Sequence, residues 1–313
     1  MADVAALGVD IGGTKLLALA VGADGEVLER RRLTTPRADA AALATTIGAV
    51  SRELGAGLPL GIGVAGITDR DGTLRYAPNL EIEDVPLARD LAAELEIPVT
   101  VHNDVTVALY AEWRVGAARD ADDVVMVTLG TGVGGGVIAG GRLLTGAEGL
   151  AGELGHLPVS DGGRLCGCGN RGCLEAYASG NAVGLRARER LADEDAPSSL
   201  RELGSDEVDG KAVTLAALDG DDFALAVLRE AGYWLGVGLT GIINAFDPEV
   251  VVIGGGAATR SAPIVVPEAS RVVADRVIGV EHRTLPRLVL AELADDAGAI
   301  GAALLALDEA STG

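Results

Sequence analysis

One histidine and three cysteines lie close together near the middle of the 313-residue chain, at His156, Cys166, Cys168 and Cys173. Three thiolates and one imidazole form a complete tetrahedral set for Zn²⁺, as in closed structural sites. The three glycines between the cysteines allow the sharp bend that two cysteines one residue apart need in order to face one ion. The alternative is a disulfide with a spare thiol, which the odd cysteine count and the crowded Cys-x-Cys pair disfavour. We therefore predict a structural zinc site.

Two glutamates, Glu153 and Glu175, flank this set of ligands, and neither is expected to bind the ion. A closed metal site that also fixes two carboxylates is typical of a scaffold that holds polar groups towards a cleft. His156 can bind the ion through one ring nitrogen and present the other to a substrate oxygen. We expect these three side chains to face a substrate.

Glycine-rich turns between short apolar strands could bind phosphate. Val4–Val9 predicts a strand that ends in Asp10–Lys15, and Leu16–Val21 predicts the next strand. Backbone N–H groups at the glycines can approach a phosphate, Thr14 offers a hydroxyl, and Asp10 can hold a hydrated Mg²⁺. The order strand, turn, strand differs from a P-loop, which opens a helix. An ordinary hairpin turn is the alternative.

A similar pattern occurs further along the chain, where Val124–Leu129 and Val137–Ala139 predict strands around the loop Gly130–Gly136. The glycines of this loop match the G-x-G-x-x-G fingerprint of dinucleotide-binding folds, but that fingerprint requires a helix after the loop. We interpret the loop as a second phosphate hairpin and a loose repeat of the first, which implies two similar lobes facing one nucleotide. A third glycine loop, Gly254–Gly256, follows the predicted strand Pro248–Ile253 and is suited to an adenosine moiety.

A polar pair, Asn103 and Asp104, follows the strand predicted at Pro98–Val101 and precedes a helix that extends to Trp113. Functional groups in α/β sheets are commonly found where a strand ends and a helix begins. Asp104 is therefore a candidate general base. The alternative is that Asp104 only caps the helix.

Composition and charge exclude several classes of protein. Apolar residues make up 49% of the chain and aromatic residues 3%, which suits alternating strands and helices, and the length suits two lobes. The net charge is −21, with 46 acidic and 25 basic residues, and no basic stripe indicates a nucleic-acid partner. The sequence contains no apolar run of membrane-spanning length and no signal peptide at its start, so we expect no membrane contact. Grouped thiols favour the reducing cytoplasm.

The apolar pattern also predicts the elements that connect these motifs. Helices are predicted at residues 39–55, 86–95, 180–192, 223–246 and 297–310. Further strands are predicted at residues 27–34, 60–64 and 287–291. The acidic segment 193–210 contains Ser and Pro and is predicted to be an exposed loop.

Taken together, these motifs resemble the ROK family (repressors, open reading frames and sugar kinases) of the actin-like ATPase superfamily. The most specific part is Glu-x-Gly-His at Glu153–His156, followed by Cys-x-Cys-Gly-x-x-Gly-Cys-x-Glu at Cys166–Glu175. The resemblance implies an α/β fold with two actin-like (ribonuclease H-like) lobes and an inter-lobe cleft. A smaller N-terminal lobe at residues 1–118, completed by a C-terminal helix at 297–313, would accompany a larger lobe at 119–296 that carries the zinc motif.

The resemblance also implies ATP-dependent, Mg²⁺-assisted phosphorylation of a hexose, with Asp104 as the catalytic base. The implied sugar-binding residues are Ala65, Gly66, Asn79, Asn103, Asp104, Glu153, His156 and Glu175. The implied ATP-binding residues are Asp10, Gly12, Gly13, Thr14, Lys15, Thr131, Gly132, Gly254, Gly255 and Gly256. As in the family, we expect a homodimer or homotetramer.

Glucose is the expected hexose, because the pairs Glu153/His156 and Asn79/Asn103 look like the family's glucose-type pattern. N-acetylmannosamine, fructose, mannose and allose are the alternatives within the family, since such sugars are separated by hydrogen-bond details. A sugar-sensing protein without turnover is disfavoured by an intact Asp104, and an NAD-dependent oxidoreductase by the missing helix. The family's repressors carry an N-terminal helix-turn-helix, for which the nine residues before Asp10 are too few.

Overall fold

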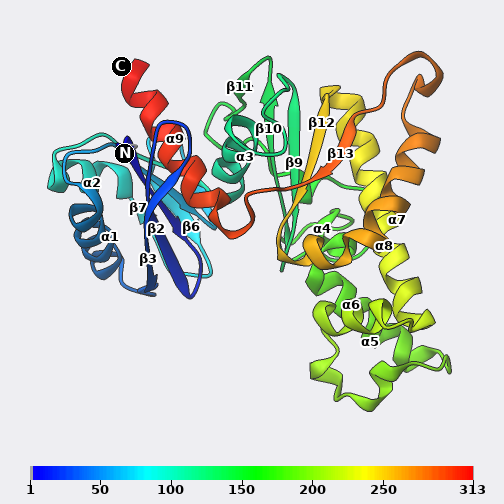
Figure 1. Ribbon diagram of the computed structural model, residues 1–313. Helices are drawn as coiled ribbons and strands as arrows, with labels where there is room; N and C mark the ends of the chain where they lie inside the picture. The colour runs from blue at the N-terminus through cyan, green and yellow to red at the C-terminus, as the bar shows by residue number, and fades with distance from the viewer. Residues whose placement is uncertain (1–2, 313) are drawn as a thin grey trace. The chain divides into compact units, whose positions relative to one another are not determined.

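The computed structural model describes residues 3–312 and contains two compact units (Figure 1). The first unit is made of Met1–Asp122, Gly136–Gly152 and Ala291–Gly313, and the second of Asp123–Gly135 and Glu153–Leu290. Both units combine strands with helices, so the predicted α/β class is confirmed. Among residues 3–312, no helix is both long and apolar enough to cross a lipid bilayer.

The first unit is built on a five-stranded sheet with the strand order β3-β2-β1-β4-β8. Its strands are β1 (Ala6–Ile11), β2 (Lys15–Val21), β3 (Val27–Thr34), β4 (Leu60–Val64) and β8 (Val99–Asn103). Neighbours among β1, β2 and β3 are antiparallel, whereas β1, β4 and β8 run in parallel. The carboxyl ends of these three parallel strands therefore meet at one edge, where Asp10 is level with Gly63 and Val64 with Asn103.

Helices cover both faces of this sheet. The helices α1 (Ala40–Gly55) and α2 (Leu87–Leu95) share an apolar core with alternate residues of β1, such as Leu7 and Val9. On the other face, α9 (Ala297–Thr312) packs against β1, β4 and the helix α3 (Asp104–Arg114). Residues between the core positions of a strand point to the opposite face, and there Gly8 leaves room for the backbone of α9. A small antiparallel sheet of β5 (Ile67–Thr68), β6 (Leu74–Ala77) and β7 (Ile82–Val85) also belongs to this unit.

The second large sheet has the strand order β11-β10-β9-β12-β13. Its strands are β9 (Val124–Leu129), β10 (Val133–Ala139), β11 (Arg142–Leu143), β12 (Val250–Gly254) and β13 (Arg287–Leu290). The strands β10 and β11 form a hairpin, whereas β9, β12 and β13 are parallel. A hairpin followed by three parallel strands repeats the order of the first sheet, as the recurring glycine-rich pattern predicts.

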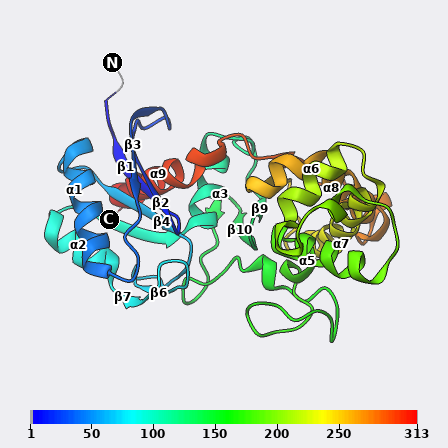
Figure 2. The ribbon, with the colours of Figure 1, turned by 90° about the horizontal axis from the view of Figure 1, so that it is seen from below.

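Helices of the second unit follow the glycine loops and the cysteine-containing segment, and they lie together in Figure 2. They are α4 (Glu175–Ala178), α5 (Gly180–Asp193), α6 (Gly210–Leu218), α7 (Asp222–Phe246) and α8 (Gly256–Arg276). Short 3₁₀ turns are η1 (Leu154–His156), η2 (Ser199–Glu202), η3 (Ser205–Glu207), η4 (Val280–His282) and, in the first unit, η5 (Ala294–Asp296). The predicted elements agree with these bounds to within a few residues, but α4, α6, α8 and the short strands β5, β6, β7 and β11 were not predicted. The segment 193–210, predicted to be an exposed loop, contains η2 and η3, and it buries Leu200 and Val208.

Candidate functional site

In the first unit, Asp10 and the start of α3 converge on one point of β4. A β-carbon built on Gly63 would lie 3.7 Å from Asp10 Oδ1 and 3.6 Å from the α-carbon of Asp104. Burial, followed by the charges of Asp104 and Asp295, raises the pKa of Asp10 from 3.8 to about 7. A buried carboxylate beside other carboxylates attracts a hard divalent cation, so Asp10 fits the Mg²⁺ that the family resemblance implies.

Asn103, rather than Asp104, is the cap of α3. Its Oδ1 accepts hydrogen bonds from Val105 N at 2.9 Å and Thr106 N at 3.2 Å, and Asp104 is the first residue of the helix. The alternative in which Asp104 serves as the helix cap is therefore wrong. Asn103 Nδ2 also donates to Gly66 O at 3.2 Å, which ties the predicted sugar-side loop to the start of α3. Direct contact of Asn103 with a sugar remains a prediction.

The first glycine-rich turn is closed by its own backbone and by a residue that the sequence analysis missed. Gly12 N donates to Lys15 O at 3.0 Å, which makes the turn a tight hairpin between β1 and β2. Thr35, which is buried, donates from Oγ1 to Gly12 O at 2.8 Å, and its N donates to Thr14 O at 3.2 Å. A threonine at the end of an edge strand carries no local signal of this role.

The predicted sugar-binding residues of this unit lie near the same hairpin. A β-carbon on Gly13 would be 3.3 Å from that of Asn79, so Asn79 stands beside the turn. Ala65 follows β4 and donates from its backbone N to Ile11 O at 3.4 Å. The structure therefore groups Asn79 and Ala65 with the hairpin, although any contact with a sugar stays a prediction.

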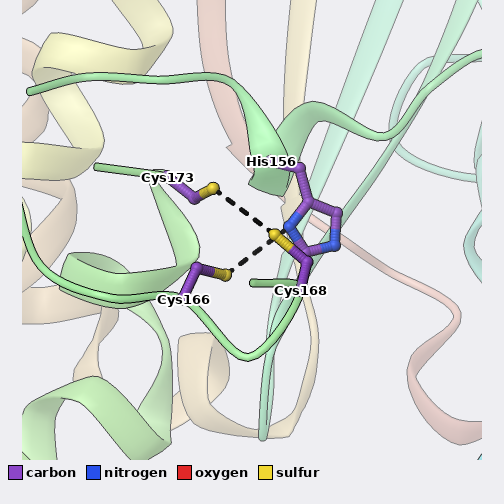
Figure 3. Close-up of side chains that lie close together, drawn as sticks. All are labelled: His156, Cys166, Cys168 and Cys173. Atoms are coloured by element: carbon purple, nitrogen blue, oxygen red, sulfur yellow. Dashed lines mark hydrogen bonds between the residues drawn. The ribbon is translucent and has the colours of Figure 1, made fainter. Parts of the chain in front are cut away.

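In the second unit, the four predicted metal ligands form one cluster (Figure 3). All four candidate donor atoms lie within 4.8 Å of one another. His156 Nδ1 is 3.7 Å from Cys166 Sγ, and Cys168 Sγ is 3.7 Å from Cys173 Sγ. Zn–S bonds of about 2.3 Å in a tetrahedron place sulfurs roughly 3.8 Å apart, so these spacings fit Zn²⁺. They are far too long for a disulfide bond, whose sulfurs are about 2.05 Å apart.

Backbone hydrogen bonds fold the cysteines into a compact knuckle. Cys166 N donates to Asn170 O at 2.8 Å, and Gly169 N donates to Cys166 O at 3.0 Å. Gly169 and Gly172 adopt positive φ, as predicted for this bend, whereas Gly167 does not. Burial raises the pKa of the Cys166 thiol to about 12, while the backbone N–H of Asn170 lowers the pKa of Cys168. A bound metal ion would deprotonate thiols that coordinate it.

The two flanking glutamates occupy different surroundings. Glu153 Oε2 is 3.9 Å from His156 Nε2, so the ring nitrogen that faces away from the sulfurs is the one beside Glu153. Glu175 Oε2 instead accepts a hydrogen bond from Val133 N at 3.0 Å, next to the predicted phosphate-binding residues Thr131 and Gly132. We refer to residues 130–133 as the 130–133 loop. Its contact with Glu175 was not predicted from the sequence.

The third glycine loop lies next to the end of β9. Gly255 has φ = 91°, and a β-carbon there would come 2.4 Å from Leu129 O, so only glycine fits. Gly256 begins α8, whose first N–H groups are suited to an anion. A small hollow of about 20 Å³ beside this loop is lined mostly by apolar side chains and glycine backbone, including Gly180, Gly210 and Ala257. The glycine-only position Gly255 and the N-terminus of α8 suit the nucleotide contact predicted for Gly254–Gly256, whereas the hollow has room for about one water molecule.

Comparison with known proteins gives consistent matches along the chain. The model of the ROK family matches residues 6–309. A glucokinase of Streptomyces coelicolor is 36% identical over 310 residues and covers 96% of both chains. An N-acetylmannosamine kinase of Escherichia fergusonii is 34% identical and covers 97% of this chain and 98% of its own. The crystal structure of a ROK family glucokinase from Streptomyces griseus, in complex with glucose and AMPPNP, has a TM-score of 0.80 and 36% identity, covering 98% of this chain and 99% of that chain.

Proposed function

Because the chain belongs to the ROK family, we propose that it transfers the γ-phosphate of ATP to a hydroxyl of glucose. Sugar phosphorylation is the activity of the kinases it resembles along its length. The observation that carries the proposal is the convergence of Asp10 and the start of α3, with Asp104, at the ends of parallel strands. A general base and a cation-binding carboxylate are the two protein groups that such a transfer needs.

In the proposed reaction, the Asp104 carboxylate takes the proton of the sugar hydroxyl as its oxygen attacks the γ-phosphorus. The new oxygen–phosphorus bond forms while the bond between the γ-phosphorus and the bridging oxygen breaks, and ADP leaves. Asp10 would hold a hydrated Mg²⁺, which offsets negative charge on the transferring group. The backbone N–H groups of the two glycine hairpins would bind the phosphates. Glu153 and His156 would orient sugar hydroxyls, because a site that pairs each hydroxyl rejects analogues that lack one.

We also propose that the Cys/His cluster binds Zn²⁺ in a structural role, because four protein ligands leave no open position on a tetrahedral ion. A cytoplasmic location fits three thiols kept reduced for a metal. A homodimer or homotetramer is proposed by analogy with the family.

The test is a coupled ADP-release assay with glucose, N-acetylmannosamine, fructose, mannose and allose. We expect the highest kcat/KM with glucose, and a loss of about 10²–10⁴-fold in kcat for Asp104→Ala, as for removal of a general base. Asp90→Ala, an exposed position of α2, is the matched control and should keep wild-type turnover. A circular-dichroism spectrum and a urea unfolding midpoint equal to those of the wild type would show that the fold of the Asp104→Ala protein is intact.

Other outcomes would lead to different conclusions. A preference for N-acetylmannosamine would favour the second candidate function, which the 34% identical N-acetylmannosamine kinase supports. Saturable sugar binding without ADP release would indicate a sugar-sensing protein. Near-wild-type turnover of Asp104→Ala would exclude Asp104 as the base.

A further inference from the structure

The segment that carries the Cys/His cluster, residues 153–180, contacts the 130–133 loop at three points. Glu175 Oε2 accepts a hydrogen bond from Val133 N at 3.0 Å. Gly180 N, at the start of α5, donates to Gly130 O at 2.8 Å. Gly155, in η1, is packed so closely that an added β-carbon would stand 1.9 Å from the Val133 carbonyl oxygen. Both ends of the loop are therefore fixed by residues that surround the metal ligands in sequence.

Glu175 joins the loop directly to the cluster. Its Oε1 is 3.4 Å from Cys166 Sγ, which donates as a thiol, and its Oε2 accepts from the loop. Because a metal ion would take the proton of this thiol, the link in the metal-bound protein runs through the backbone from the ligand Cys173 to Glu175. A β-carbon on Gly132 would lie 2.4 Å from Glu175 Oε2, so the loop backbone closes onto this carboxylate. Leu174, directly before it, is fully buried and packs against Gly238 of α7. The backbone on one side of Glu175 is thus fixed in the core, and its side chain spans the gap between cluster and loop.

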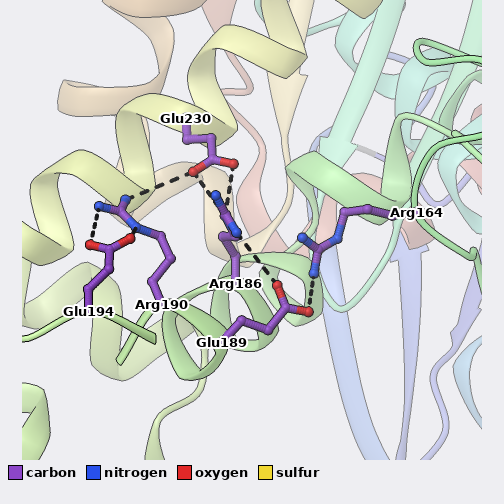
Figure 4. Close-up of polar contacts among 6 residues, drawn as sticks. All are labelled: Arg164, Arg186, Glu189, Arg190, Glu194 and Glu230. Atoms are coloured by element: carbon purple, nitrogen blue, oxygen red, sulfur yellow. Dashed lines mark hydrogen bonds and ion pairs between the residues drawn. The ribbon is translucent and has the colours of Figure 1, made fainter. Parts of the chain in front are cut away.

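A second set of contacts holds the same segment from the outside and offers a comparison. Arg164, between His156 and the first cysteine, pairs with Glu189 of α5 at 2.6 Å, and a chain of arginines and glutamates continues to Glu230 of α7 (Figure 4). These side chains are partly exposed, and such ion pairs contribute little to stability. The ion pairs among these six side chains do not involve residues 130–133, so they can be removed without changing the hydrogen bond from the loop to Glu175.

We propose that the metal-binding segment positions the phosphate-binding hairpin, and that Glu175 is the positioning residue that transmits this effect. The inference rests on the proposed function, in which the 130–133 loop binds the phosphates of ATP. A loop whose N–H groups are already ordered binds an anion with a smaller entropic cost than a mobile one. The metal site then supports binding of the phosphate donor, whereas the family resemblance implies that Glu175 binds the sugar.

The experiment measures binding of each substrate alone. Dissociation constants of Mg²⁺–ADP without sugar, and of glucose without nucleotide, are determined by calorimetry for wild type, Glu175→Ala and Glu175→Gln. We expect Glu175→Ala to weaken Mg²⁺–ADP binding about tenfold to a hundredfold, because a charge-assisted hydrogen bond to the loop is lost. Glu175→Gln should recover most of this loss, since its amide oxygen can still accept from Val133 N. Hydrogen exchange at residues 130–135 should rise in Glu175→Ala but not in Glu175→Gln.

Matched controls separate the link from general damage. Glu189→Ala removes a glutamate that contacts the same segment but not the loop, and should bind Mg²⁺–ADP within twofold of wild type. Zinc content, measured by mass spectrometry, should stay equal in all four proteins. Removing the metal from the wild-type protein with a chelator, followed by buffer exchange, should raise hydrogen exchange at 130–135 as Glu175→Ala does.

Two results would overturn the proposal. One is a Glu175→Ala protein that binds glucose more weakly but binds Mg²⁺–ADP as the wild type does, with unchanged hydrogen exchange at residues 130–135. That result would leave Glu175 as a sugar contact only. The other is metal removal that leaves the exchange of the loop unaltered. If the wild type itself binds neither substrate, the proposed function fails, and the exchange data still decide whether Glu175 orders the loop.

Discussion

In the first unit, the surroundings of Asp10 disfavour ionisation of its carboxyl group. It lies at the end of β1, where burial and the nearby carboxylates of Asp104 and Asp295 raise its pKa to about 7. The folded protein therefore binds this proton more tightly than the unfolded chain, whose value is 3.8. The contribution of this group to folding stability is fully present below its unfolded pKa of 3.8, and it is lost as the pH rises through its folded pKa of about 7. A cation bound beside Asp10 would offset the free-energy cost of ionising its carboxyl group.

Asp10→Asn should therefore stabilise the protein without ligands, and more so at high pH. At 1.36 kcal/mol per pKa unit, the gain over wild type should grow by roughly 2 kcal/mol between about pH 5.5 and about pH 8. This is an upper value, because Gly298 brings the start of α9 next to the Asp10 carboxyl, and a helix N-terminus favours negative charge. Urea unfolding of both proteins at the two pH values measures the difference. Mg²⁺–ADP should then stabilise the wild type more than the variant.

Asp90→Asn, on the exposed side of α2, provides the control for removing one negative charge. Its stability relative to wild type should change little with pH. An Asp10→Asn protein whose gain is equal at both pH values would contradict the assigned burial of this carboxylate.

At the scale of elements, features encoded locally could be predicted from the sequence. The hairpins, the individual strands and the metal cluster depend on residues near one another in the chain, and the predicted elements lie within a few residues of their places. The helix α8 was missed because Pro263 and Pro267 lie inside it. Both prolines are on its exposed face, where carbonyls that lose their partners reach water.

Contacts between distant segments could not be predicted. The bond from Val133 N to Glu175 joins residues 42 apart, and nothing in either local pattern specifies it. Thr35 likewise closes the first hairpin from the residue directly after β3. Such contacts follow from the packing of whole elements, which the sequence determines only through the complete fold.

The packing of α9 against the first unit depends on glycine at its interface. A β-carbon on Gly301 would lie 1.7 Å from the Val107 carbonyl oxygen of α3, which neither helix can accommodate without moving. Gly301→Ala should therefore destabilise the protein by about 1–3 kcal/mol or more, as overpacked cores do. Thermal unfolding and the denaturation midpoint in urea measure this loss.

Gly241→Ala in α7 is the matched control, because its added β-carbon would meet nothing within 4 Å beyond the adjoining residues and backbone of its own helix. It should raise stability by roughly 0.4–1 kcal/mol, since alanine restricts the unfolded chain and favours helix. Equal effects of the two substitutions would show that the close approach of α9 and α3 does not exist in solution.

At the scale of the whole molecule, the net charge favours a sugar kinase over a DNA-binding repressor, the two classes of protein in the family. DNA-binding proteins gain affinity by neutralising phosphates with clustered basic residues. This chain has a net charge of −21, and arginines such as Arg31, Arg52 and Arg271 pair with nearby carboxylates. The net charge therefore opposes the approach of a polyanion, and salt screens this repulsion beyond roughly 8 Å at physiological ionic strength.

We therefore expect no binding to double-stranded DNA in a mobility-shift or anisotropy titration, at about 0.05 M or about 0.15 M salt. Counterion release makes even non-specific binding strongest at low salt, so the lower concentration is the stricter condition. Saturable binding that weakens steeply as salt is added would contradict this expectation and would favour a regulatory function.

The negative charge of the protein should also repel ATP, so moderate salt should lower the KM for Mg²⁺–ATP while leaving the KM for the uncharged sugar unchanged. Because only the charged substrate responds to screening, this pair of measurements tests the field of the whole protein within the same enzyme assay.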